Sequence, residues 1–219
     1  MIPTDAVRAA ALPRVLLVGP RPVAPVTGGV QKGIESLLRT DLARRTSMRV
    51  FNNYRPRDPH RPLPARLWYQ LGMIRSFRRE IRRQPVDLVH VKTSSGINFH
   101  QNALYALAAR CLGLPVLMQI HGGKFERFYQ ASHPLMQAWI RHTLSASDAV
   151  AVLSRRWVER IARVAPEARV VVIPNGLESS EIASLSQPGE KRPERVLFIG
   201  TGDPVLNDEK GLRDLLEAL

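Results

Sequence analysis

Short apolar runs alternate with longer amphipathic stretches along most of this chain, and that alternation limits the folds the chain can adopt. The apolar runs have the length and composition of buried strands, and they lie at 14–19, 48–53, 87–92, 115–120, 148–153 and 168–173. Stretches with helical periodicity separate them, near 30–45, 64–83, 99–112, 135–145 and 157–164. Because parallel strands need a long crossover, usually a helix, this pattern predicts an α/β protein with a doubly wound, mostly parallel sheet.

The alternation is interrupted once. Residues 177–194 are polar and contain two prolines and a glycine, a composition typical of a linker. A strand-like run, a Lys-Gly pair and the start of a helix follow over 195–219. We therefore expect one complete domain over 1–176 and the first strand and helix of a second domain after the linker. That last unit should be unstable without further chain or a partner, because it cannot bury its apolar face alone.

Composition excludes several other classes of protein. Apolar residues make up 44% of the 219 residues and charged residues 23%, which excludes disorder as the main state. Cys111 is the only cysteine, so a disulfide scaffold is excluded, and its helical setting predicts a position in the core. No apolar run approaches the length of a membrane span, and residues 1–20 lack the pattern of a signal peptide. We therefore expect a protein of the reducing cytoplasm.

The charge balance points to an anionic partner. Lysine and arginine number 32 against 19 acidic residues, a net charge of +13, and 27 of the 32 are arginine. Such an excess is typical of proteins that meet nucleic acid, phosphorylated substrates or anionic membranes. The alternative is a genome that favours arginine codons, with the arginines simply solvated.

The basic residues are concentrated between positions 55 and 83. This stretch has nine arginines against Asp58 and Glu80, and apolar residues recur in it at helical spacing. A basic amphipathic helix over 64–83 could lie on an anionic bilayer, or it could be an ordinary surface helix whose apolar stripe packs on the sheet. No recognisable nucleic-acid-binding motif accompanies the arginines, so we expect no nucleic-acid partner.

Polar and glycine residues follow the predicted strands at their carboxyl ends, where open α/β sheets bind ligands. Gly28 and Gly29 precede a helix and could offer backbone N–H groups to an anion, or could simply form a tight turn. His121 lies between a strand and Gly122, where it could donate a hydrogen bond to a sugar hydroxyl or a phosphate. The alternative for His121 is a loop histidine whose hydrogen bonds are satisfied by the backbone.

A third strand end carries Lys92, Thr93 and Ser94. His90 lies within the same strand and is expected to have a packing role. The histidines show no metal-ligand spacing, and the loop at 19–29 lacks the glycine fingerprint of dinucleotide-binding proteins.

The loops taken together resemble one family. The order of a strand and GG loop, DLVHV, QIHGGKFERFY, SDAVAVLS, VVVIPNGLE, VLFIG and KG, over residues 14–219, is similar to GT-B glycosyltransferases of the family-4 type. This resemblance implies two Rossmann-like domains, the first binding the acceptor and the second a nucleotide-sugar. It implies a retaining transferase that moves a sugar to a lipid-linked or polysaccharide acceptor in bacterial cell-surface glycan synthesis, including lipopolysaccharide. The reaction would need no metal or other cofactor, with the nucleotide-sugar as co-substrate.

The resemblance also assigns residues. It implies that His121 faces the transferred sugar as the catalytic residue, and that Lys210 holds the donor diphosphate near Thr201. The acceptor side would be formed by residues at the other strand ends, namely Gly28, Gly29, Lys92, Thr93, Ser94, Gly122 and Lys124.

Two residues depart from the family's pattern. Thr201 stands where the family usually has arginine, and Lys92 stands where it often has a second histidine. Lys92 could therefore bind an anionic group of the acceptor, or could merely be exposed.

Three functional classes stay open at this point. The chain could be the acceptor-binding half of a glycosyltransferase, inactive alone and in need of a missing C-terminal half or partner chain. It could be a non-catalytic subunit that binds the acceptor or docks on a membrane beside a separate donor-binding chain. It could also be an unrelated nucleotide-binding protein, although the missing glycine fingerprint argues against that class.

Overall fold

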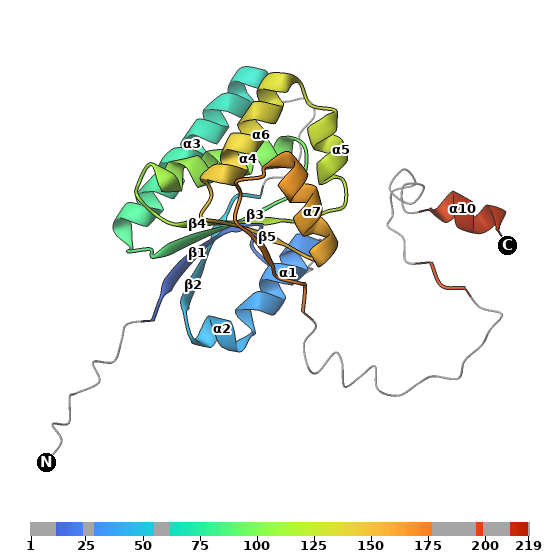
Figure 1. Ribbon diagram of the computed structural model, residues 1–219. Coiled ribbons are helices and arrows are strands. Elements are labelled where there is room, and N and C mark those ends of the chain that lie inside the picture. The colour runs from blue at the N-terminus through green and yellow to red at the C-terminus, as the bar shows by residue number, and fades with distance from the viewer. Residues whose placement is uncertain (1–11, 24–28, 55–61, 177–195, 199–210, 219) are drawn as a thin grey trace, which may run out of the picture. The chain divides into compact units, whose positions relative to one another are not determined.

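The computed structural model describes residues 12–23, 29–54, 62–176, 196–198 and 211–218, and its central feature is a parallel sheet (Figure 1). The strands follow the order β2-β1-β3-β4-β5-β6, and every neighbouring pair is parallel. Their bounds are β1 Arg14–Gly19, β2 Ser47–Asn52, β3 Leu88–Thr93, β4 Val116–Ile120, β5 Ala149–Val152 and β6 Val170–Val172. The predicted doubly wound parallel sheet is confirmed.

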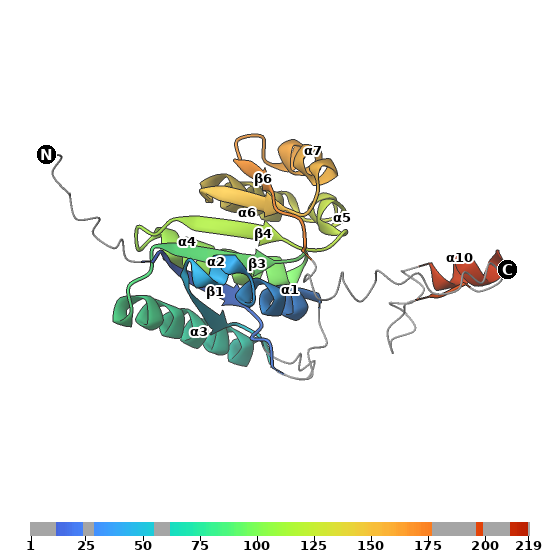
Figure 2. The ribbon, with the colours of Figure 1, turned by 90° about the horizontal axis from the view of Figure 1, so that it is seen from below.

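Helices cover both faces of this sheet. The described helices are α1 Gly29–Leu38, α2 Asp41–Arg44, α3 Leu63–Arg83, α4 Ile97–Arg110, α5 Phe125–Gln130, α6 Pro134–Ala146, α7 Arg155–Val164 and α10 Leu212–Glu217. In Figure 1, α1 and α2 lie below the sheet while α3, α4 and α6 lie above it, and Figure 2 shows α1 and α2 in front of the strands. This division follows from right-handed crossovers, because the chain moves one way from β1 to β2 and the opposite way from β2 through β3 to β6.

The main apolar core lies between the sheet and the layer that contains α3, α4 and α6. Phe77, Phe99, Ile140 and Ile161 are fully buried there against strand residues that include Val89. The opposite face of the sheet has a smaller apolar contact, formed by Leu17 of β1 and Ile34 of α1. Polar side chains occupy the neighbouring positions on that second face.

Several predicted elements differ from the observed ones. The helix predicted over 30–45 is two helices, because Thr40 has an extended backbone (φ −78°, ψ 164°) that ends α1 and precedes α2. Helix α5 was not predicted, because its six residues are too few to show a helical period. Cys111 is exposed at the C-terminal end of α4, so its predicted core position is wrong.

The chain divides into two compact units, Met1–Leu177 and Glu178–Leu219. The described part of the second unit comprises 196–198 and 211–218, which includes α10. The predicted linker, 177–194, lies outside the described residues. The domain boundaries therefore stay predictions.

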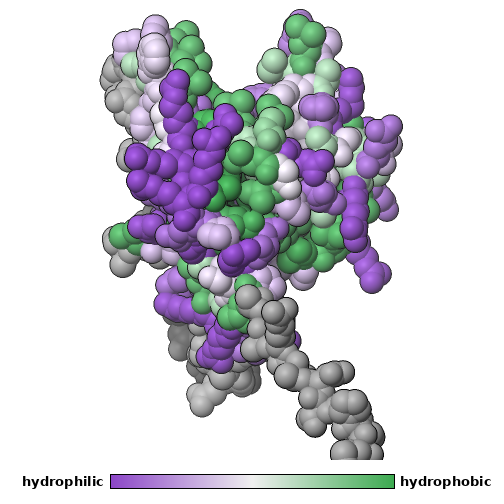
Figure 3. Space-filling view, turned by 90° about the vertical axis from the view of Figure 1, so that its left-hand side faces the viewer, coloured by the Kyte–Doolittle hydropathy of each residue, from purple (hydrophilic) through white to green (hydrophobic). Residues whose placement is uncertain are grey.

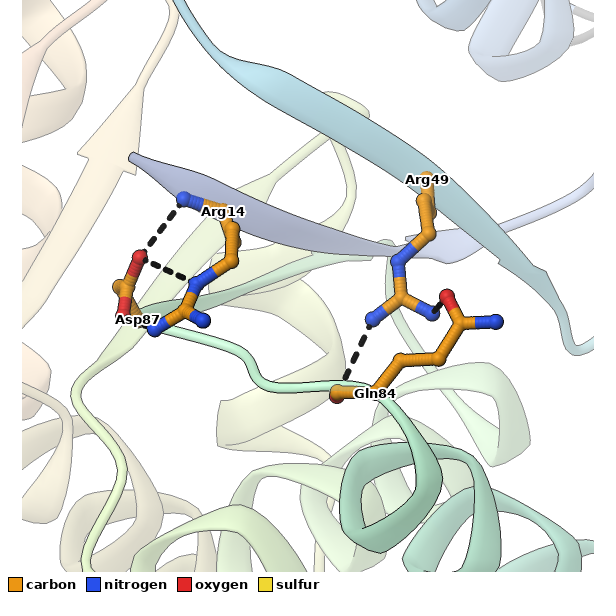
Figure 4. Close-up of polar contacts among 4 residues, drawn as sticks. All are labelled: Arg14, Arg49, Gln84 and Asp87. Atoms are coloured by element: carbon orange, nitrogen blue, oxygen red, sulfur yellow. Dashed lines mark hydrogen bonds and ion pairs between the residues drawn. The ribbon is translucent and has the colours of Figure 1, made fainter. Parts of the chain in front are cut away.

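Aspartates at the beginnings of two strands tie neighbouring strands together. Asp87, before β3, accepts hydrogen bonds from the Arg14 backbone N–H at 2.8 Å and from its guanidinium at 2.6 Å and 3.0 Å (Figure 4). Asp148, before β5, likewise accepts from the Val116 backbone N–H at 2.8 Å and from Arg110. In both cases a carboxylate satisfies the first N–H of the adjacent strand, which fixes the register at the amino edge.

A further arginine joins β2 to the end of α3. Arg49 donates to Glu80 at 2.8 Å. It also donates to the Gln84 backbone carbonyl at 3.3 Å and contacts the Gln84 side-chain oxygen (Figure 4). These contacts hold the end of α3 beside β2.

Replacing Asp87 with alanine should destabilise the protein at neutral pH. The Arg14 guanidinium lowers the pKa of the Asp87 carboxyl from 3.8 to about 2, so this contribution is present above pH 3.8 and is lost as the pH falls towards 2. Thermal unfolding at pH 7 and pH 2 should show a loss for Asp87→Ala that shrinks at the lower pH. Asp41→Ala, which removes an exposed i,i+3 ion pair, is the control. Equal losses for both variants at pH 7 would contradict a special role for Asp87.

Candidate functional site

A group of buried polar side chains lies at the carboxyl ends of β3 and β4. His90, Lys92, Gln119 and His121 are exposed by only 8%, 5%, 4% and 7%. Side chains alternate along a strand, and Lys92 pairs in register with Gln119, so all four belong to the same face of the sheet. We call them the β3–β4 polar cluster.

Helix α1 packs over this cluster. A Cβ atom at Gly33 would lie 3.7 Å from the Lys92 ammonium nitrogen, which places that ammonium against the helix. A Cβ atom at Gly19 would lie 2.7 Å from Ile34 Cδ1 and 3.8 Å from Lys92 Cβ. The glycine that ends β1 therefore lets α1 approach the sheet beside Lys92.

Lys92 is buried without a counter-charge. In the part of the chain that the structure describes, its ammonium has no hydrogen bond and no ion pair. Burial lowers the pKa of Lys92 from 10.5 to about 8, because transfer from water penalises the charged form. Of the two interpretations of Lys92 made from the sequence, simple exposure is wrong.

His90 is a packed, neutral histidine, in line with its expected role. Its Nε2 lies 3.0 Å from the amide oxygen of Gln119, so this nitrogen carries the proton that the bond needs. Burial, and then the charge of Lys92, lower the pKa of His90 to about 3. The bond fixes the Gln119 side chain next to Lys92.

His121 follows β4 directly. Its backbone N–H donates to the Thr93 carbonyl at 2.7 Å, which extends the pairing of β3 and β4 by one residue. Its Nε2 atom is buried and has no hydrogen-bond partner among the described residues. Burial, and then the charge of Lys92, lower the pKa of His121 from 6.5 to about 4, so the ring is neutral at physiological pH. The alternative of a histidine fully satisfied by the backbone does not fit this unpaired nitrogen.

A second network shapes the loop after β3, on the opposite face of the sheet. Asn102 Nδ2 donates to the Lys92 carbonyl at 3.2 Å and to Asn98 Oδ1 at 3.1 Å. Asn98 Oδ1 also accepts from the Ser94 backbone N–H at 2.9 Å and its hydroxyl at 3.0 Å, while Thr93 Oγ1 lies 3.4 Å from it. The hydroxyls of Thr93 and Ser94 are thus engaged in holding the loop.

The sequence analysis did not predict the hydrogen-bonding roles of Asn98, Asn102 and Gln119. The i,i+4 spacing of Asn98 and Asn102 on the helix that follows a strand end was the available signal. Gln119 gave none, because a single amide in an apolar strand does not reveal its partner.

The other predicted site residues divide into two groups. Gly29 is the first residue of α1 and has open space where a Cβ would lie, Gly122 has a positive φ of 100°, and Lys124 directly precedes α5. The positive φ explains why glycine stands after His121, since other residues rarely adopt it. Gly28, Thr201 and Lys210 lie outside the described residues.

The parallel sheet with helices on both faces defines a Rossmann-like domain. The sequence profile of glycosyltransferase family 4 matches residues 28–181, which is more than half of the chain. The chain therefore belongs to glycosyltransferase family 4, and the resemblance inferred from its loop order is confirmed.

The comparison with solved structures found matches at low sequence identity. Sucrose-phosphate synthase from Thermosynechococcus elongatus superimposes with a TM-score of 0.54 and 15% identity, over 80% of this chain and 53% of that one. UGT89C1 of Arabidopsis thaliana, determined in complex with UDP-L-rhamnose, gives a TM-score of 0.44 and 13% identity, over 77% and 53%. The chain thus spans about half the length of the synthase. The comparison with curated proteins gave no match.

Replacing Lys92 with methionine should raise the pKa values of both cluster histidines, because the lysine charge lowers each of them. The change keeps a long apolar side chain in place and removes the ammonium. A pH titration of the histidine ring signals by NMR measures the effect, with Lys32→Met on the outer side of α1 as a matched control. If Lys92→Met left both histidine pKa values unchanged, the arrangement of the cluster described here would be wrong.

Proposed function

We propose that this chain is the acceptor-binding half of a retaining glycosyltransferase. The complete protein would transfer a sugar from a nucleotide-sugar to a lipid-linked or polysaccharide acceptor in bacterial cell-surface glycan synthesis. The observation that carries the proposal is His121 at the carboxyl edge of a family-4 domain, with a buried Nε2 that has no partner among the described residues. Such a nitrogen is costly to leave unpaired, and a substrate hydroxyl would satisfy it.

The reaction would exchange one bond at the sugar's anomeric carbon for another. The bond to the leaving diphosphate breaks, the acceptor oxygen forms the new bond, and the acceptor proton passes to the departing phosphate. Because its pKa is about 4, His121 would act as a neutral hydrogen-bonding group and not as a charged acid. Its role would be to orient the transferred sugar against the acceptor.

Cationic and backbone groups would bind the substrates without a metal ion. On the acceptor side these are Gly28 and Gly29 at the beginning of α1, together with Lys92, Thr93, Ser94, Gly122 and Lys124. Thr93 and Ser94 would act through the loop that they hold in place. In the second unit, Lys210 and Thr201 would contact the donor diphosphate.

The protein would work in the cytoplasm, attached to the inner face of the cytoplasmic membrane through residues 64–83. Side chains in the first half of α3 remain exposed although they are large and apolar, by 71% at Leu63, 66% at Leu67, 69% at Trp68 and 49% at Leu71. The second half packs on the core through Phe77 and Ile81, as expected of a surface helix, and the exposed first half supports the proposed membrane contact. None of the described helices has the length and apolarity needed to cross a membrane.

The surface around α3 supports this attachment. Figure 3 shows hydrophobic side chains lining a hollow between two projecting parts, which lie where α3 and α6 begin at the top of Figure 1. The first turn of α6 adds Leu135 and Met136, exposed by 70% and 43%, and α4 adds Leu104 and Leu107. The flanking positive charge comes from exposed arginines of α3, namely Arg66, Arg75, Arg78, Arg79, Arg82 and Arg83. Apolar side chains beside arginines match an anionic bilayer surface.

A non-catalytic subunit is the second candidate. The same exposed surface favours it equally. Such a subunit would bind the acceptor or the membrane for a separate donor-binding chain.

Replacing His121 with alanine should lower the turnover of the complete enzyme by about 10²-fold or more, as the loss of a hydrogen bond made in the transition state would. Transfer of a labelled sugar to lipid-linked acceptors measures the effect. His142→Ala, at an exposed position of α6, should leave turnover unchanged. Full turnover by a folded His121→Ala enzyme would remove this residue from the reaction, and no transfer by the complete wild-type protein would favour the subunit.

Charge reversal on α3 should abolish binding to anionic vesicles. The variant replaces Arg75, Arg78, Arg79 and Arg82 with glutamate, and flotation with phosphatidylglycerol-containing and zwitterionic liposomes measures the effect. The control also replaces four exposed arginines with glutamate, and so changes the net charge by the same amount. These arginines are Arg44, Arg155, Arg156 and Arg169. Loss of binding in both variants would indicate a general charge effect, and retention by the α3 variant would exclude this surface.

A further inference from the structure

The β3–β4 polar cluster contains the positive charge of Lys92, and no described residue adds a negative charge to it. Lys92 is buried, and two histidines lie close enough for its charge to lower their pKa values. No carboxylate among the described residues contributes to the pKa of Lys92 or of either histidine. The nearest helix supplies one acid, Glu35, which is paired with Lys32 at 3.4 Å and Arg39 at 2.8 Å.

Buried cations in proteins are normally paired, because an isolated one loses its hydration without compensation. Lys92 breaks this rule at the edge of the sheet where ligands bind. The Lys92 ammonium and the buried Nε2 of His121 both lack a hydrogen-bond partner among the described residues, and the charge of Lys92 lowers the pKa of His121, so the two groups lie near one another. The polar groups of Gln119 and His90 are already joined to one another and do not satisfy them.

The shape of α1 leaves room at the same place. Gly33 presents no side chain to Lys92, and a Cβ there would stand 3.7 Å from the ammonium.

We propose that Lys92 binds a phosphate or carboxylate group of the acceptor beside His121, so that the enzyme selects anionic acceptors. This inference rests on the proposed function, and it names the class of acceptor that the same site takes. The anion would accept hydrogen bonds from the Lys92 ammonium and supply the counter-charge that the described residues do not provide, while Nε2–H of His121 stays available to a hydroxyl of the transferred sugar.

Direct binding to the 219-residue chain tests the anion site without any transfer reaction. Inorganic phosphate, a sugar phosphate and the same sugar without phosphate are titrated while the His121 ring signal is followed by NMR. We expect saturable shifts and a raised His121 pKa with the first two probes only. Lys32→Met should behave as the wild type, and Lys92→Met should bind at least tenfold more weakly. No saturable response in the wild type would overturn the proposal.

A second variant keeps the test decisive if Lys92→Met does not fold. Gly33→Ala places a methyl group at ordinary contact distance from the ammonium and favours the helix, so it should fold. It should weaken phosphate binding because the methyl group takes part of the open space. Unchanged phosphate binding by folded Gly33→Ala would exclude an anion between α1 and Lys92.

Steady-state kinetics of the complete protein distinguish an anion of the acceptor from an anion of the nucleotide-sugar. Lys92→Met should raise KM for an acceptor that carries a phosphate or carboxylate and leave KM for the nucleotide-sugar unchanged. A raised KM for the nucleotide-sugar alone would overturn the assignment to the acceptor. If the complete protein transfers no sugar, the proposed function fails while the phosphate titration still reports on the anion site.

Discussion

The right-handed crossover between parallel strands determines where everything else in this domain lies. Because β1 connects outward to β2 and the chain then returns to β3, the helices α1 and α2 fall on one face and the later helices on the other. The apolar core forms under the larger helical layer. The opposite face at β3 and β4 is left to α1, whose close approach at Gly19 and Gly33 makes the place where polar side chains collect.

The sheet was predictable because its signal is local and repeated. Each apolar run of five or six residues followed by a turn is visible in the sequence, and the crossovers leave little choice of topology. The helix boundaries were less predictable where a helix is too short to show a helical period, as at α5. They were also less predictable where one residue, such as Thr40, adopts an extended backbone. Cys111 shows the same limit, since the helical pattern around it did not reveal that it lies at the exposed end of α4.

The position of the candidate site could be predicted from the sequence, but the burial and the contacts of its side chains could not. Carboxyl strand ends locate His121 and Lys92 from the sequence alone. In a parallel strand, however, both faces are buried, so alternation does not tell which polar residue is covered and which is open. Lys92 is buried beside Gly33 of α1, which lies 59 positions earlier in the chain, and no sequence pattern connects the two. The asparagine network that fixes the loop after β3 likewise depends on contacts between α4 and the strand end.

The two edges of the sheet differ in how their charged side chains are paired. At the amino edge, Asp87 and Asp148 meet arginines and strand N–H groups, so both carboxylates are paired and serve the register. At the carboxyl edge a lysine is buried beside two neutral histidines, and the described residues offer no acid. A buried charge without a partner costs stability. Binding of the proposed anion at Lys92 would recover that cost, which is the physical reason for proposing the carboxyl edge, and not the amino edge, as the place for substrate.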